Sequence, residues 1–156
     1  VLEGLAARQA AENGLNEEQK HEMQSLLTCG DLLFEGAELT EDDLATYHDM
    51  NRRFHLLIIE ASGNLAIQAA LSKNEHLPFA SVSALAIDKN NMQKEFKRFA
   101  FAHQQHHHVF HAMLSRQGAR AEGIMREHAQ ATLGYDRNYH RTELKNILTV
   151  ISHANK

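Results

Sequence analysis

Histidine is the unusual residue of this 156-residue chain, which contains twelve of them. His55 follows Asn51 by four residues, so both side chains project from one face of a helix. His106 and His128 also fall on apolar stripes of helical spacing, so all four side chains are expected to point inward. The stripes consist of Leu44, Tyr47 and Ile58, of Phe99, Ala102, Val109 and Met113, and of Ala121, Met125 and Thr132.

A turn near Gln117 and Gly118 separates the helices that carry His106 and His128. Each histidine is about eleven residues from this turn, or roughly 16 Å along a helix that rises about 1.5 Å per residue. An antiparallel hairpin would therefore bring the two to the same level. This symmetry would serve His107 equally well, and the apolar stripe favours His106.

Inward imidazoles need hydrogen-bond partners or a metal, because burying an unpaired polar group is costly. Three histidine nitrogens suit zinc, nickel, copper or iron, and such a site keeps open positions for water or a substrate. A single histidine on an apolar stripe is, however, more often a satisfied core or interface residue. The neighbouring row of His103, His107 and His111 is equally compatible with a solvated or interface face, and His108 is expected to be exposed.

The elements that would position these residues are helices almost throughout. Apolar residues recur at helical spacing, and one proline and eight glycines leave little room for a many-turned β fold. Helices are expected over 2–13, 16–34, 40–61, 64–71, 91–117, 119–138 and 142–151, with N-caps at Asn16 and Thr40 and a loop or broken helix over 74–90. The sequence predicts one all-α domain, an antiparallel bundle of six or seven helices.

Composition limits the function. The net charge of −4 argues against strong nucleic-acid binding by this chain itself. Cys29 is the sole cysteine, which favours a reducing, cytoplasmic setting. No window is apolar enough to span a bilayer and there is no secretory signal pattern. The helical pattern is already running at Val1, so an N-terminal part is expected to be missing.

Several short motifs resemble those of the FCD domain, the C-terminal sensor of the FadR subfamily of GntR-type transcription regulators. The matching segments are Leu2-Glu3 with Ala6-Ala7, residues 51–55, residues 61–64, His106 with Ala112, and residues 118–128. The resemblance covers nearly the whole chain, 1–156. It implies an all-α antiparallel bundle that senses an effector, dimerises and acts with an N-terminal winged helix-turn-helix domain on operator DNA.

The resemblance also implies a site, because an aspartate and three histidines commonly hold a metal in this family, often zinc. A small carboxylate effector binds at that metal. The metal ligands would be Asn51, His55, His106 and His128, and Asn51 departs from the family's aspartate. An amide oxygen can ligate a metal but carries no charge. The carboxylate of the effector could supply the missing negative charge. The nearest residues to orient the effector are Arg52, Arg126 and His107, with Arg53 as a further arginine.

Three functions are compatible with these residues. The first is an effector-sensing regulatory domain that is not an enzyme. The second is a metalloenzyme with an open histidine site, which would need a general base; no carboxylate shares the stripes of His106 and His128, since Glu127 lies on another face. The third is a metal-free helical dimerisation module whose histidines are core or interface groups.

Overall fold

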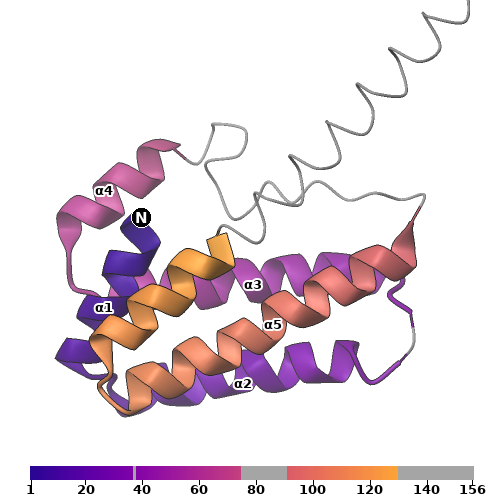
Figure 1. Cartoon of the computed structure of the whole chain (residues 1–156), viewed down its shortest axis with the longest axis horizontal. Helices are drawn as coiled ribbons and strands as arrows, with labels where there is room; N and C mark the ends of the chain where they lie inside the picture. The colour runs from indigo at the N-terminus through magenta and orange to yellow at the C-terminus, as the bar shows by residue number, and fades with distance from the viewer. Residues whose placement is uncertain (37, 75–90, 130–156) are drawn as a thin grey trace, which may run out of the picture.

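The chain forms a bundle of helices, as predicted (Figure 1). The computed structural model describes residues 1–36, 38–74 and 91–129, and within these ranges there is no strand. The helices are α1 (Leu2–Asn13), α2 (Glu17–Leu33), α3 (Glu41–Ala61), α4 (Leu65–Asn74), α5 (Met92–Leu114) and a further helical segment over residues 118–129. Helix α4 continues three residues beyond the predicted end at Leu71, so Asn74 is helical and does not belong to the loop or broken helix predicted over 74–90. The rest of that predicted loop, the rest of the helix expected to reach residue 138 and the helix expected over 142–151 lie outside the described residues.

The two predicted N-caps are both present and define where α2 and α3 begin. Asn16 accepts a hydrogen bond at 2.8 Å from the backbone N–H of Gln19, whose side chain accepts one in return from the backbone of Asn16 at 3.0 Å. Thr40 and Asp43 make the same reciprocal pair at the start of α3. These capping boxes satisfy backbone donors that have no partner inside the helix, so the helix starts are fixed locally.

Replacing Thr40 by alanine is expected to lower the free energy of unfolding by about 1 kcal/mol, because the first turn of α3 loses its side-chain acceptor. Thr46→Ala is the matched control, since the exposed Thr46 hydroxyl only donates to the carbonyl of Asp42 within the same helix. Urea denaturation of both variants measures the difference. Equal losses in the two variants would show that the cap contributes nothing specific.

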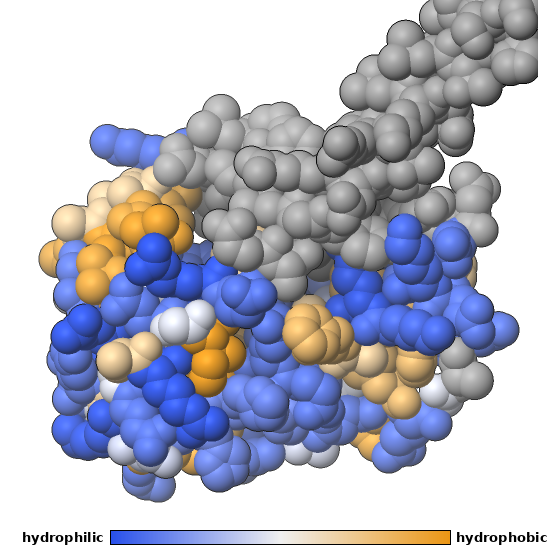
Figure 2. Space-filling model, in the orientation of Figure 1, coloured by the Kyte–Doolittle hydropathy of each residue, from blue (hydrophilic) through white to orange (hydrophobic). Residues whose placement is uncertain are grey.

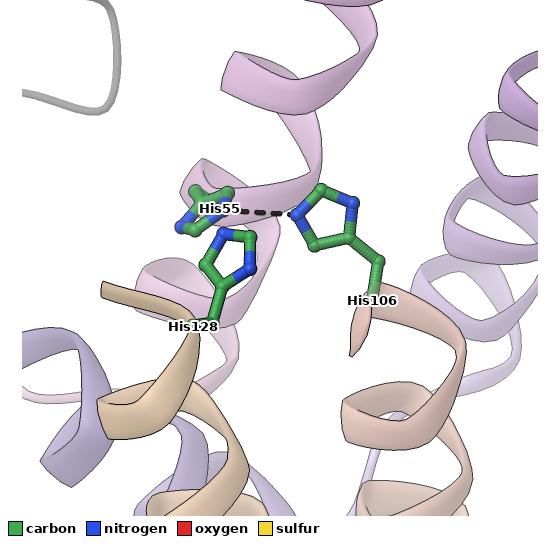
Figure 3. A group of neighbouring side chains, drawn as sticks. All are labelled: His55, His106 and His128. Carbon is green, nitrogen blue, oxygen red and sulfur yellow. Dashed lines mark hydrogen bonds between the residues drawn. The ribbon is translucent and has the colours of Figure 1, made fainter. Parts of the chain in front are cut away.

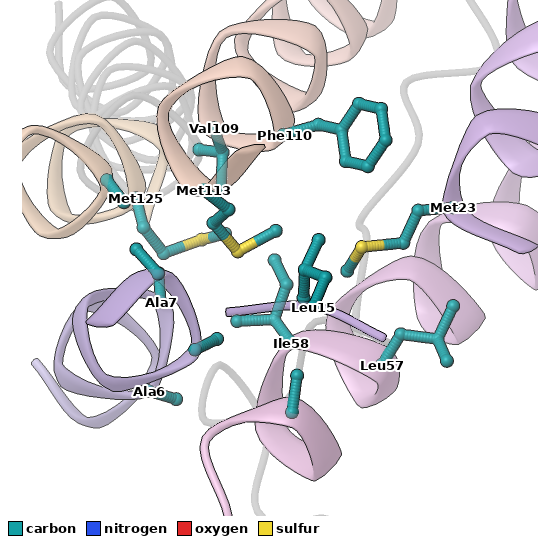
Figure 4. Packing of buried hydrophobic residues seen from close by; sticks show 14 of the residues in the cluster. Ala6, Ala7, Leu15, Met23, Leu57, Ile58, Val109, Phe110, Met113 and Met125 are labelled. Atoms are coloured by element: carbon teal, nitrogen blue, oxygen red, sulfur yellow. The ribbon is translucent and has the colours of Figure 1, made fainter. Parts of the chain in front are cut away.

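Small residues allow α1 to pack closely against several other helices. Ala6, Ala7, Ala10 and Ala11 are all fully buried, and α1 contacts α3, α4 and α5. Their short side chains let these helices approach closely, with larger residues filling the space around them (Figure 4). The core residues labelled there include Leu15, Met23, Leu57, Ile58, Val109, Phe110, Met113 and Met125.

The turn between α5 and the 118–129 segment differs from the prediction by a few residues. Helix α5 ends at Leu114 instead of Gln117, Arg116 takes a left-handed backbone conformation with φ of 55°, and Gly118 already begins the next helix. Gly118 lies close against α1, because a Cβ there would lie 2.9 Å from the Glu12 side chain, which would have to shift. The glycine thus lets the 118–129 segment pack against α1.

The surface is mixed. Figure 2 shows one face that is largely hydrophilic, with apolar residues gathered over α4, where Leu65 is 76% exposed. None of the helices in the described ranges has the length and apolar character needed to cross a membrane.

Candidate functional site

Three buried histidines from three helices meet inside the bundle (Figure 3). His55 comes from α3, His106 from α5 and His128 from the 118–129 segment, and their ligand nitrogens all lie within 4.8 Å of one another. We call this group the histidine triad. The rings of His106 and His128 have centroids 4.7 Å apart, so the hairpin does bring them to the same level.

The nitrogens of the triad are arranged so that they face one another. Nε2 of His55 lies 3.3 Å from Nε2 of His106, so at most one proton can lie between them. Two nitrogens bound to one tetrahedral metal lie about 3.3–3.4 Å apart when each bond is about 2.0–2.1 Å. Nδ1 of His128 donates to Gln105 Oε1 at 3.1 Å, which makes Nε2 its lone-pair nitrogen. The triad therefore fits a divalent metal.

Burial keeps two rings of the triad, His106 and His128, neutral. It lowers the pKa of His106 well below its usual value, and charge on His128 or His55 would lower that pKa further. Burial, followed by repulsion from His55, lowers the pKa of His128 to about 3 even though Glu3 opposes the shift. His106 and His128 are thus in the unprotonated form at neutral pH, which is the form that binds metals.

Glu3 is a neighbour of the triad that sequence reasoning did not assign to it. Its Oε2 atom lies 3.3 Å from Nδ1 of His55. Burial alone would raise the pKa of Glu3, but the charge of His55 and its hydrogen bonding to the carboxylate outweigh burial and lower it. A usable signal was present, because Glu3 precedes the buried Ala6 and Ala7 by three and four residues and so shares their face of α1.

The fourth predicted ligand, Asn51, is buried with 3% exposure on α3, one helical turn before His55. The residues predicted to orient an effector lie outside the triad. Arg52 is exposed, and Arg126 pairs at 3.5 Å with Glu122 on the surface. His107 lies with its Nε2 atom 2.8 Å from Asp31 of α2.

The row of histidines beside His106 on α5 does not form a uniform face. His103 is buried with 1% exposure, His107 is partly exposed and His111 is exposed. A solvated face is therefore wrong for His103, whereas the exposure of His111 fits either a solvated or an interface face. His108 is exposed, as predicted.

Comparison with known protein families identifies one match, which covers most of the chain. The sequence model of the FCD domain matches residues 1–131, a span that includes the whole triad, Glu3 and Asn51. No curated protein sequence matches the chain significantly. Because the match covers well over half of the 156 residues, the chain belongs to the FCD domain family, whose members are effector-binding domains of transcription regulators.

Proposed function

We propose that this domain senses a small organic acid at a divalent metal held by the histidine triad. The observation that carries the proposal is the convergence of three buried imidazoles from separate helices, with two Nε2 atoms only 3.3 Å apart. Such a cluster is costly in a core unless something satisfies its nitrogens together, and a metal does so. Zinc is our first choice, with nickel or another transition metal as the alternative.

The ligands would be His55, His106 and His128, with Asn51 as the fourth. When bound, the metal supplies positive charge and open positions at which a carboxylate can bind. Asn51 adds no negative charge, so an anionic effector would complete the charge balance of the site. Arg52, Arg126 and His107 remain our proposed residues for orienting that acid.

Glu3 supports the role of His55 as a ligand and argues against an enzyme. It contacts Nδ1 of His55, whereas Nε2 of the same ring faces His106. A carboxylate on the second nitrogen of a metal-binding histidine orients the ring and raises its basicity. Among the described residues, the carboxylate beside the triad thus lies on the side away from the proposed metal, where it cannot serve as a general base for a metal-bound water.

The regulatory effect would come from linking three helices. An acid that binds at the triad contacts a point shared by α3, α5 and the 118–129 segment. If one packing of these helices binds the acid more tightly, the acid shifts the population toward it. We propose that this shift changes how a cytoplasmic homodimer holds operator DNA through winged helix-turn-helix domains.

A screen by thermal melting tests the proposal. Small mono-, di- and tricarboxylic acids are added to the metal-loaded and the metal-stripped chain, with the corresponding amides as matched controls. At least one acid should raise Tm only when metal is present, and a ligand at 100 times its Kd should stabilise by about 2.7 kcal/mol. The same acid should change operator affinity of the full-length regulator. If no acid shifts either quantity, the proposal is wrong.

A further inference from the structure

A second group of potential metal ligands joins α2 to α5, outside the triad. Asp31 Oδ1 lies 2.9 Å from Nε2 of His103 and 2.8 Å from Nε2 of His107. The two histidines are spaced i, i+4 on α5, and their ring centroids are 4.9 Å apart. All three ligand atoms lie within 4.8 Å of one another. One carboxylate oxygen therefore faces two imidazole nitrogens at once.

These separations are close to those within a metal's coordination sphere. Adjacent ligands of an octahedral ion with bonds of about 2.0–2.1 Å lie about 2.8–3.0 Å apart, and those of a tetrahedral ion about 3.3–3.4 Å apart. The Asp31 distances match the first value and need a change of only about 0.5 Å to reach the second. Two histidines and one carboxylate form a ligand set that zinc, nickel, cobalt and iron all accept.

His103 is held in place by its surroundings. Its ring packs on Gly30, where a Cβ would come 2.2 Å from Cε1 of the ring, and beside Phe34 at a centroid distance of 5.5 Å. Burial lowers the pKa of His103 although its hydrogen bond to Asp31 opposes the shift, and Nδ1 on the other side of the ring makes no hydrogen bond. A ring fixed in this way pays little entropy when it binds an ion.

The local charge also favours a cation. Asp31 lies in the last turn of α2, and no basic residue accompanies it there. A carboxylate at a helix C-terminus is unfavourable because the helix dipole already makes that end negative. A divalent ion beside Asp31 would offset the charge of its carboxylate and the negative end of the α2 dipole. The triad has Asn51 at its carboxylate position, so this second group carries the formal negative charge that the triad's own ligand set lacks.

Solvent can reach the group. An open cavity of about 440 Å³ borders it, lined by residues that include Asp31, Phe34, Glu35, Phe96, Phe101 and His103. The His107 side chain is 28% exposed and that of Asp31 is 47% exposed. Helices α2 and α5 contact each other directly, as the lower half of Figure 1 shows. An ion could thus enter without opening the core.

We propose that Asp31, His103 and His107 form a second binding site for a divalent first-row transition ion, separate from the triad. The ion replaces the protons that the two Nε2 atoms would otherwise share with Asp31, and it clamps α2 to α5. Because the ring centroids of His103 and His106 are 5.9 Å apart, the clamp lies directly beside the triad.

Zinc titration of the 156-residue chain, by calorimetry and elemental analysis, tests the site. The parent is expected to bind about two equivalents, and Asp31→Asn and His107→Gln about one each. Loss of an outer-shell partner already weakens metal binding by about 10- to 100-fold, so loss of a direct ligand should weaken the second site by at least about 100-fold. His108 is an exposed neighbour on the same helix, so His108→Gln is the matched control and should still bind about two equivalents of zinc.

Other outcomes separate this site from its alternatives. If Asp31→Asn leaves the zinc stoichiometry and affinities of the parent unchanged, the group is only a hydrogen-bonded clamp and the proposal is wrong. If His111→Gln removes an equivalent and Asp31→Asn does not, the ion binds an exposed His107–His111 pair and the proposal is equally wrong. If the parent binds a single equivalent that Asp31→Asn abolishes, the second site stands and metal binding by the triad fails.

Discussion

Replacing His106 by alanine is expected to lower the zinc affinity of the triad by at least about 100-fold, since a direct ligand matters more than an outer-shell partner. His106 is fully buried, and its Nε2 atom lies 3.3 Å from that of His55, so alanine removes one of the nitrogens that would bind the metal and no exposed side chain lies in its place. Competition with a chromogenic chelator measures the affinity. His108→Ala is the matched control, because it removes an exposed imidazole two residues away.

The experiment is cleanest in the Asp31→Asn background, where zinc at the second proposed site no longer contributes. His106 packs against Phe54 at a ring-centroid distance of 4.8 Å, so alanine also leaves a cavity. Far-ultraviolet circular dichroism and a His106→Gln variant, which fills more of that space, distinguish loss of the ligand from loss of the fold. Zinc affinity within threefold of the parent in both folded variants would rule out the triad as a metal site.

Features that depend on neighbouring residues in the chain were predicted well. The caps at Asn16 and Thr40 satisfy backbone groups only three residues away, so their sequence signals are complete in themselves. The convergence of His106 and His128 was also accessible, because one short turn joins their helices. The apolar periodicity predicted that His106 and His128 point inward, and counting residues from the turn predicted that they lie at the same level along the two helices.

Features that depend on which helices become neighbours were not predictable in the same way. Asp31 and His103 are 72 residues apart in the chain, and Glu3 contacts His55 from a different helix. A helical stripe shows that a side chain points inward but not which helix it meets. Gly118 illustrates a related ambiguity, because glycine signals a turn in sequence, whereas here it makes room for Glu12 of α1.

The metal-free domain is expected to lose stability as pH falls from 7.5 to 5.5. The pKa of His128 is about 3 in the folded chain, and burial lowers that of His106 well below its usual value. In the unfolded chain both titrate near about 6.5, so over this range the unfolded state binds more protons and stability rises with pH. His128 should cost about 1.4 kcal/mol at pH 5.5, and His106 should add a loss of the same sign.

Urea denaturation in the presence of a chelator, at several pH values, measures this loss. The lowered pKa values of Glu3 and Asp31 keep those carboxylates ionised throughout the range, so they do not add to the slope. His103, whose pKa burial also lowers, adds a share of the same sign. His128→Gln should reduce the loss by about 1.4 kcal/mol, whereas His108→Gln should leave it unchanged. An identical pH dependence in parent and His128→Gln would mean that His128 is protonated as easily in the folded chain as in the unfolded one, and the description of His128 as a buried, neutral member of the triad would have to be abandoned.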